Sequence, residues 1–328
     1  MRRIALACSI VVVLAAPAVA LAQQPVPAPA TPVQTALTLT LERIGASQAT
    51  VLVGDRIRVR GAVGTFVAGE AITVRFYSDG KKMLAKRRAL VPGPAGSGQF
   101  EFSYRAQRSG RLKVIAFHDA TPALGGLAAK AARLVDVLPR SVGSDSRRRA
   151  VRAVQRRLGR LGYVVGSRGS FDARTQRAVL AFRKVTGMAR TARASTPVMR
   201  AIARGRGAFK IRRRDHGRHI EADLTRQVIA LISGGKVRRI YPISSGAPGT
   251  PTVLGAFRVY SKTPGTNAKG MVDSAYFIRG YATHGFSSVP IYPASHGCLR
   301  VPIPDARSLF HWIRVGTPVD VYYGPKPK

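Results

Sequence analysis

The spacing of apolar residues changes twice along this chain of 328 residues, and this change limits the possible fold most strongly. Residues 36–139 and 207–325 carry short apolar runs between turn residues, which is typical of strands. Between them, apolar residues recur at helical spacing. Side chains repeat with periods of about 2 in strands and about 3.6 in helices, so no single element type accommodates both patterns. We predict a multidomain chain with an all-β sandwich, a small three-helix bundle and a mostly-β C-terminal domain.

The first β-rich region, residues 36–139, alternates apolar and polar residues at 37–41 and 57–60. About seven short strands in roughly 100 residues are typical of a β-sandwich, and we expect an immunoglobulin-like one. No Cys-Trp-Cys signature is present, so the topology stays open. The other predicted strands are 72–77, 99–104, 112–117 and 134–138.

The helical region, residues 146–205, follows a short polar linker. A first helix is predicted at 151–161, and Gly162 is expected to end it. Asp172 is the expected N-cap of a second helix that runs to Val185. A third, shorter helix is predicted at 197–203.

The residue pattern of this region resembles the common peptidoglycan-binding domain, which implies peptidoglycan as a partner. Two other interpretations stay open: a basic helix-turn-helix that reads nucleic acid, and a bundle that is only a spacer. The matching residues are Val154, Gln155, Leu158, Leu161, Gly162, Tyr163, Gly169, Phe171, Asp172, Thr175, Ala178, Val179, Phe182 and Gly187.

Residues 1–22 are typical of a secretory signal peptide. Two arginines precede an apolar run at 4–16 that is too short to span a bilayer, and small residues follow for cleavage. A membrane anchor is the alternative. The Pro- and Ala-rich stretch 23–35 is predicted to be a flexible linker. We therefore expect an exported protein of the periplasm or cell wall, without stable membrane insertion after cleavage.

The net charge is +39, from 54 basic and 15 acidic residues, and it points to a polyanionic neighbourhood. This charge excludes the profile of an ordinary acidic cytosolic enzyme. For an exported protein, anionic cell-wall polymers are the expected partners and nucleic acid is not.

Residues 283–302 carry the candidate chemistry. The other cysteine, Cys8, lies in the predicted signal peptide, so Cys298 is the lone thiol of the mature chain. A lone thiol in an exported protein is either a reactive group or an inert buried side chain. A neighbouring imidazole, from His284 or His296, can take its proton and leave a nucleophilic thiolate.

Two more residue types in this stretch suit acyl chemistry. Gly297 gives the chain the freedom to turn sharply beside the thiol, and such a turn can aim backbone amides at a developing oxyanion. The planar guanidinium of Arg300 suits a substrate carboxylate.

Two motifs here resemble the catalytic domain of L,D-transpeptidases of the YkuD type. They are His284-Gly285 and Ser295-His296-Gly297-Cys298-Leu299-Arg300. The resemblance covers about residues 209–323. It departs from the family at Phe286, where threonine is frequent, and in the short segment between His284 and Cys298. Both departures bear on the shape of the substrate loop more than on the chemistry.

The resemblance implies a role for each motif residue. Cys298 would be the nucleophile and His284 the general base, later the acid for the leaving group. The backbone around Gly297 would contribute to the oxyanion hole, and His296 would shape the site. Sequence alone does not separate the two histidines as bases. The implied substrate-binding residues are Ser295, Arg300, Gly285 and Tyr276.

The implied reaction cleaves D-Ala from a tetrapeptide stem through a cysteine thioester and forms a 3→3 peptidoglycan cross-link. The resemblance also implies acylation by carbapenems. Water as acceptor would make the protein an L,D-carboxypeptidase, and a non-catalytic wall-binding protein is a further alternative. Acyl transfer of this kind needs no metal or organic cofactor.

A zinc site from two histidines and the cysteine is the metal alternative. The sequence has no Cys-x-x-Cys or His-Glu-x-x-His pattern, so we expect no metal. His216 and His219 are interpreted as a loose polar turn, and His118 as a structural residue at a strand end.

Overall fold

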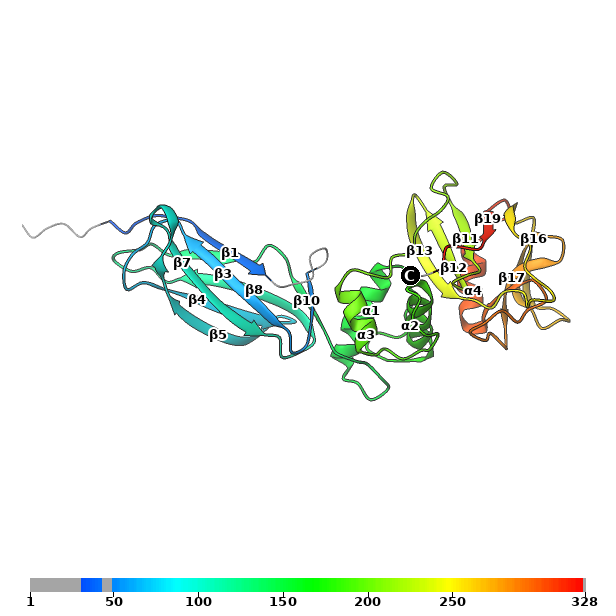
Figure 1. Ribbon diagram of the computed structural model, residues 1–328, viewed down its shortest axis with the longest axis horizontal. Coiled ribbons are helices and arrows are strands. Elements are labelled where there is room, and N and C mark those ends of the chain that lie inside the picture. Colours follow the sequence, from blue (N-terminus) through cyan, green and yellow to red (C-terminus); the bar gives the residue numbers. More distant parts are fainter. Residues whose placement is uncertain (1–30, 43–48, 327–328) are drawn as a thin grey trace, which may run out of the picture.

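The computed structural model describes residues 31–42 and 49–326. The predicted signal peptide and the first part of the predicted linker lie outside the described residues. The described chain is mostly β-structure with four α-helices. Figure 1 shows a β region, a helical region and a second β region in a row along the long axis. No helix of the described part is long and apolar enough to cross a membrane.

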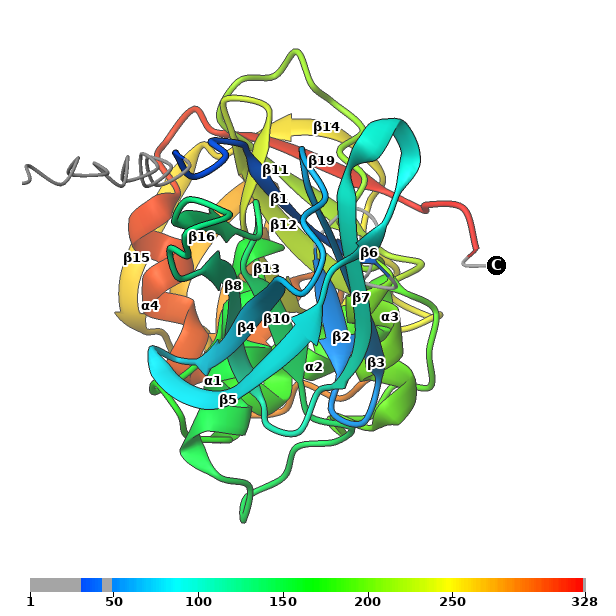
Figure 2. The same ribbon diagram turned by 90° about the vertical axis from the view of Figure 1, so that its left-hand side faces the viewer.

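The N-terminal β region consists of two sheets whose facing side chains form one core. Figure 2 looks at this region along the long axis. The immunoglobulin-like arrangement stays a prediction. The first sheet contains β1 (Leu37–Glu42), β3 (Arg56–Val63), β7 (Gly98–Arg105) and β6 (Val91–Pro92). The second contains β2 (Thr50–Leu52), β10 (Val135–Leu138), β8 (Gly110–His118), β4 (Ala71–Ser78) and β5 (Lys81–Ala89), with β9 (Leu127–Lys130) paired to β8.

The sequence patterns miss β5, the edge strand of the second sheet. Its residues, KKMLAKRRA, are mostly basic and show no apolar alternation, because an edge strand buries little of its surface. Its pairing with β4 defines it instead. At the other end, Val33 of the predicted linker bridges to Leu124, so the described part of that linker is attached to the β region.

The middle region contains α1 (Arg148–Arg160), α2 (Ala173–Val185) and α3 (Thr196–Ala203). Gly162 follows α1 with a φ of +91°, a conformation that favours glycine. The Asp172 carboxylate accepts the Thr175 amide at 2.8 Å, which confirms it as the N-cap of α2.

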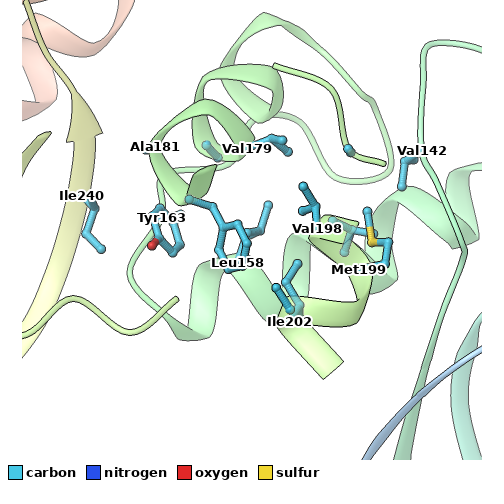
Figure 3. Close-up of a cluster of buried hydrophobic side chains, with 14 of the residues drawn as sticks. Val142, Leu158, Tyr163, Val179, Ala181, Val198, Met199, Ile202 and Ile240 are labelled. Atoms are coloured by element: carbon cyan, nitrogen blue, oxygen red, sulfur yellow. The ribbon is translucent and has the colours of Figure 1, made fainter. Parts of the chain in front are cut away.

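The core of the helical region continues into the second β region. Tyr163 lies between α2 and β13, where it bridges to Ile240, and its hydroxyl donates to the Gly207 carbonyl at 2.6 Å. Figure 3 shows Tyr163 between the helical core and Ile240. Because the two regions share one buried cluster, the helices are packed against the C-terminal region rather than tethered to it.

The C-terminal region has two sheets and one helix, α4 (Ile303–Trp312). The sequence pattern predicts this helix at 306–314, and it begins earlier because Pro304 suits the first turn of a helix. One sheet contains β13 (Lys236–Pro242), β12 (Val228–Ser233), β11 (His219–Asp223), β19 (Pro318–Tyr322) and β14 (Gly255–Arg258). The other contains β15 (Ser261–Thr266), β16 (Val272–Ile278), β17 (Tyr281–Phe286) and β18 (Leu299–Pro302).

The polar residues of β11 differ from expectation because they are buried. His219 and Glu221 are both fully buried and contact each other at 3.3 Å. Glu221 also accepts the amides of Arg212 and Arg213 and the Tyr322 hydroxyl. The interpretation of His219 as part of a loose polar turn is therefore wrong. It belongs to a buried network that links the backbone of Arg212 and Arg213 to β11.

Candidate active site

The pairing of β17 with β18 brings the two sequence motifs together. The strands are parallel, and His284 lies opposite Arg300 while Thr283 lies opposite Leu299. Side chains alternate between the two faces of a strand. Leu299 and Val301 point into the core, so His284, Arg300 and, one step beyond the strand, Cys298 share the other face.

Cys298 is partly buried at the edge of this face. The Ala282 amide donates to its Sγ at 3.4 Å, and Sγ lies 3.7 Å from the Gly280 carbonyl. Burial raises the pKa of the Cys298 thiol, while the Ala282 amide and the nearby Arg300 charge act in the opposite direction. The resting thiol is therefore protonated at neutral pH.

His284 is 2% exposed, and its ring has a defined tautomer. Its Nδ1 lies 2.9 Å from the Gly285 carbonyl oxygen, which only accepts hydrogen bonds, so Nδ1 carries the proton. Nε2 of the neutral ring is then a free base. Burial lowers the pKa of His284, and the Arg300 charge lowers it further, so the ring is neutral at pH 7.

Phe286, the residue that departs from the family pattern, contacts both neighbours. Its ring meets the His284 ring edge-on, with centroids 5.7 Å apart. The Arg300 guanidinium lies 4.1 Å from the centre of the same ring. The sequence predicts that the departure at Phe286 affects the shape of the substrate loop, and in the structure its ring contacts the histidine and the arginine. Its position two residues after His284 on a strand is the signal that places it on the same face.

The turn before Cys298 is held by Ser295. The Ser295 hydroxyl donates to the Cys298 carbonyl at 2.6 Å and accepts the Gly297 amide at 3.1 Å. Gly297 has a φ of +108°, and a Cβ there would lie 1.8 Å from the Tyr281 ring. Only glycine fits this position. Because the Gly297 amide is already bonded, the Cys298 amide is the remaining oxyanion donor of this turn, and it has no acceptor among residues 31–42 and 49–326.

The segment 244–252 supports this turn from behind. The Ser245 carbonyl accepts the amides of Ala294 and Ser295 at 2.8 and 2.9 Å. The Ala247 amide and the Thr250 hydroxyl both donate to the Ser295 carbonyl, at 2.8 and 2.9 Å. The glycines of this segment therefore belong to a loop beside the site, as the sequence suggests.

The remaining predicted site residues, His296, Tyr276 and Gly285, do not all lie on the face of Cys298. His296 is exposed, while Tyr276 lies opposite Ala282 and so on the face of Cys298. Gly285 is on the opposite face, where a Cβ would lie 2.6 Å from Ala306 of α4. Its lack of a side chain lets α4 pack closely, and its carbonyl orients His284. Both roles differ from the contact with substrate that the sequence predicts.

His216 and His219, the histidines of the predicted polar turn, each contact a carboxylate. His216 Nδ1 lies 2.9 Å from Asp320, and His219 contacts Glu221. Within the described residues, no group of three or more His, Cys, Asp or Glu side chains is arranged to hold a metal ion.

Comparison with known proteins gives two family matches. Residues 217–321 match the L,D-transpeptidase catalytic domain, YkuD, and residues 147–202 match the putative peptidoglycan-binding domain. Comparison with curated proteins returned no match.

Solved structures of similar proteins include an L,D-transpeptidase from Xylanimonas cellulosilytica. It is 33% identical over 56% of this chain and 98% of that chain, with a TM-score of 0.50. A cysteine-to-serine mutant of an Enterococcus faecium L,D-transpeptidase is 30% identical over 32% of this chain and 50% of that chain, with a TM-score of 0.29.

Proposed function

Because this chain belongs to the L,D-transpeptidase family, with a YkuD catalytic domain preceded by a peptidoglycan-binding domain, we propose that it transfers peptidoglycan stem peptides through a thioester on Cys298. The observation that carries the proposal is the shared face of β17 and β18. There the neutral thiol and an imidazole with an unprotonated Nε2 come from adjacent strands.

The first half-reaction follows from these groups. His284 Nε2 takes the proton of Sγ, and the thiolate attacks the carbonyl carbon before the terminal D-Ala of a tetrapeptide stem. The oxyanion accepts a hydrogen bond from the free Cys298 amide. His284 then returns the proton to the departing amine, D-Ala leaves, and the stem remains as a thioester.

The acceptor determines the product. If the side-chain amine of a neighbouring third residue attacks the thioester, an amide forms, the thiol is regenerated and the result is a 3→3 cross-link. If water attacks, the product is a trimmed tripeptide stem, and the protein is an L,D-carboxypeptidase. The burial of the two histidines favours His284 as the base. His284 is buried on the face of Cys298, whereas His296 is exposed.

The remaining regions are proposed to hold the enzyme at its polymer. The helical region, residues 146–205, would bind peptidoglycan and raise the local concentration of stems. We propose the boundaries 36–139 for the β-sandwich and 207–325 for the catalytic domain, and export to the periplasm or cell wall. No cofactor enters any step.

One face of the N-terminal region supports contact with anionic wall polymers. On the outer face of the second sheet, Arg75 packs 3.9 Å from the centre of the Phe117 ring. Arg75, Lys82, Lys113 and Lys130 of this face form no ion pair with a carboxylate among the described residues. The outer face of the first sheet, in contrast, pairs Arg58 and Arg60 with Glu42 and Glu101. The basic residues that accompany Arg75 on the outer face of the second sheet are Lys82, Arg87, Lys113 and Lys130.

The experiment that tests this function is incubation with purified disaccharide-tetrapeptide, followed by mass spectrometry. A dimer equal to two monomers less one free alanine establishes transpeptidation. A monomer that exchanges its D-Ala for water establishes carboxypeptidase activity. Cys298→Ala should abolish both while wall binding persists, and a carbapenem should add its mass only to the protein that keeps the thiol. Turnover by Cys298→Ala would exclude Cys298 as the nucleophile.

A further inference from the structure

Lys184, in the last turn of α2, is buried at the junction of the helical and C-terminal regions. It is 3% exposed. Its Nζ donates to two backbone carbonyls of the C-terminal region, Ile243 at 2.9 Å and Gln227 at 3.1 Å. A buried lysine is expensive unless its donors are satisfied, so a role in packing alone is better served by an apolar side chain.

The two carbonyls belong to residues that are connected to the turn at Ser295–Cys298, called the catalytic turn below. Gln227 is 1% exposed with a φ of +55°, and its side chain holds Ser245. Gln227 Nε2 donates to the Ser245 hydroxyl at 2.7 Å, and the Ser245 amide donates to Gln227 Oε1 at 2.9 Å. The Ser245 carbonyl in turn accepts the amide of Ser295 at 2.9 Å.

Ser295 completes the connection, because its hydroxyl donates to the Cys298 carbonyl. An unbroken series of buried hydrogen bonds therefore runs from α2 to the backbone of the cysteine. Each intermediate residue, Gln227, Ser245 and Ser295, is 3% exposed or less. Hydrogen-bond networks in a low-dielectric interior hold their members in one arrangement.

A second basic side chain of the helical region acts in parallel. Arg190 donates to the Thr225 carbonyl at 2.8 Å and to the Ile291 carbonyl at 2.9 Å. Thr225 lies two residues before Gln227, and Ile291 lies four residues before Ser295. Arg190 thus contacts the chain at two points, one shortly before Gln227 and one shortly before Ser295.

We infer that Lys184 is a positioning residue for Cys298: the helical region orients the catalytic turn through Gln227, Ser245 and Ser295. This inference rests on the proposed function, and it gives the helical region a part in the reaction itself besides holding the polymer. A small displacement of the nucleophile is enough to slow catalysis, since misplacement by about 1 Å can lower a rate roughly a hundredfold.

The test compares Lys184→Met with Arg177→Gln in the full chain. Arg177 also joins α2 to the C-terminal region, through Asp305 of α4 at 2.7 Å, but among the described residues Asp305 forms no hydrogen bond with Gln227, Ser245 or Ser295. We expect Lys184→Met to lower kcat on the tetrapeptide by roughly tenfold or more, with KM changed by less than about twofold. Arg177→Gln should leave both constants near those of the unmodified protein.

Ser245→Ala tests the middle of the connection with the loss of one hydroxyl. Its effect should have the same sign, and the double variant with Lys184→Met should be no worse than the stronger single variant, because both interrupt one series. Fully additive losses would overturn the inference. If Lys184→Met does not fold, Ser245→Ala alone carries the test, since it interrupts the same series at the Gln227–Ser245 hydrogen bond.

A second readout keeps the inference separate from the proposed function. The rate of Cys298 alkylation by iodoacetamide needs no peptide substrate. It should rise several-fold in Lys184→Met and Ser245→Ala, since a loosened turn exposes Sγ, and stay unchanged in Arg177→Gln. An inactive wild-type protein that shows this pattern would refute the transpeptidase and keep the connection. Folded Lys184 and Ser245 variants with unchanged alkylation and kcat would refute the connection.

Discussion

At the scale of single residues, the Gly285 carbonyl determines how His284 can act. It accepts Nδ1–H and leaves Nε2 as the base, while burial keeps both this imidazole and the Cys298 thiol neutral at rest. In the proposed reaction, Cys298 would then lose its proton during the attack on substrate rather than before it.

This resting state predicts the pH dependence of thiol modification. Because burial raises the pKa of Cys298, alkylation by iodoacetamide should keep rising with pH beyond about 8.5, the ordinary value of a thiol. Arg300→Gln should slow alkylation at any fixed pH below that range, since the Arg300 charge lowers the thiol pKa. A rate that is already maximal at pH 6 would instead indicate a thiolate–imidazolium pair and contradict the prediction.

The same pKa directions predict the acid limb of turnover. His284 works as a base only when neutral, and its lowered pKa keeps it neutral below the usual range of histidine, about 6.5. The acid limb of activity should therefore lie below the pH at which an ordinary histidine titrates. A loss of kcat/KM centred at pH 7 or above would show that another group is the base.

Gly297 and Gly280 form a matched pair beside the thiol. Gly297→Ala places a Cβ against Tyr281 and keeps a φ of +108°, so we expect loss of turnover and a destabilisation of about 1–3 kcal/mol or more. Gly280→Ala meets no atom within 4 Å and should leave both nearly unchanged. Thermal unfolding and alkylation of the two variants check this, and equal behaviour would contradict it.

At the scale of elements, α2 contributes more to the C-terminal region than an apolar surface. Arg174 and Arg177 pair with Asp305, which is 2% exposed, and Lys184 reaches the ends of β12 and β13. Of these three side chains, Lys184 is the one that reaches the segment behind the turn at Ser295–Cys298.

Burial lowers the pKa of Lys184 to about 7, with Arg190 as the nearest cation acting in the same direction. An unfolded lysine titrates near about 10.4, so between these values the unfolded chain binds more protons than the folded chain. The free energy of unfolding contributed by this residue should rise with pH in that window, by at most roughly 1.4 kcal/mol per pH unit.

The measurement is the difference in unfolding free energy between the wild-type chain and Lys184→Met at pH 7 and pH 9. We expect the difference to shift in favour of the wild type at pH 9. Lys236→Met, at an exposed position, is the control and should show no such shift. A difference independent of pH would mean that Lys184 titrates normally in the folded protein.

At the scale of the whole molecule, the N-terminal region carries a basic face on its second sheet, around Arg75. The face that holds Cys298 and His284 lies in the C-terminal region, at the other end of the long axis. The reversals Arg75→Glu, Lys82→Glu and Lys113→Glu together should weaken binding to wall polymer at low salt and flatten its salt dependence. Lys236→Glu, Arg238→Glu and Arg314→Glu, at exposed positions of the C-terminal region, change the net charge equally away from that face and should weaken binding less. Sedimentation with purified cell walls across a salt series measures this, and equal losses would mean that net charge alone governs binding.

The sequence by itself determined the features that depend on neighbours in the chain. The apolar period and Asp172 specified α2, because capping and helical spacing act within a few residues. Adjacent Gly234 and Gly235 specified the turn between β12 and β13, since both adopt positive φ. The Ser-His-Gly-Cys motif likewise marks Cys298 as a candidate nucleophile.

Only the tertiary structure decided what depends on residues far apart in the chain. The register of β17 on β18 put His284 on the face of Cys298 and Gly285 on the opposite face, while His296 is exposed. The same is true of the buried polar residues of β11, the exposed strand β5 and the connection from Lys184 to Ser295. Burial and strand pairing are created by long-range packing, and a local pattern of residue types carries no record of which distant segment will cover it.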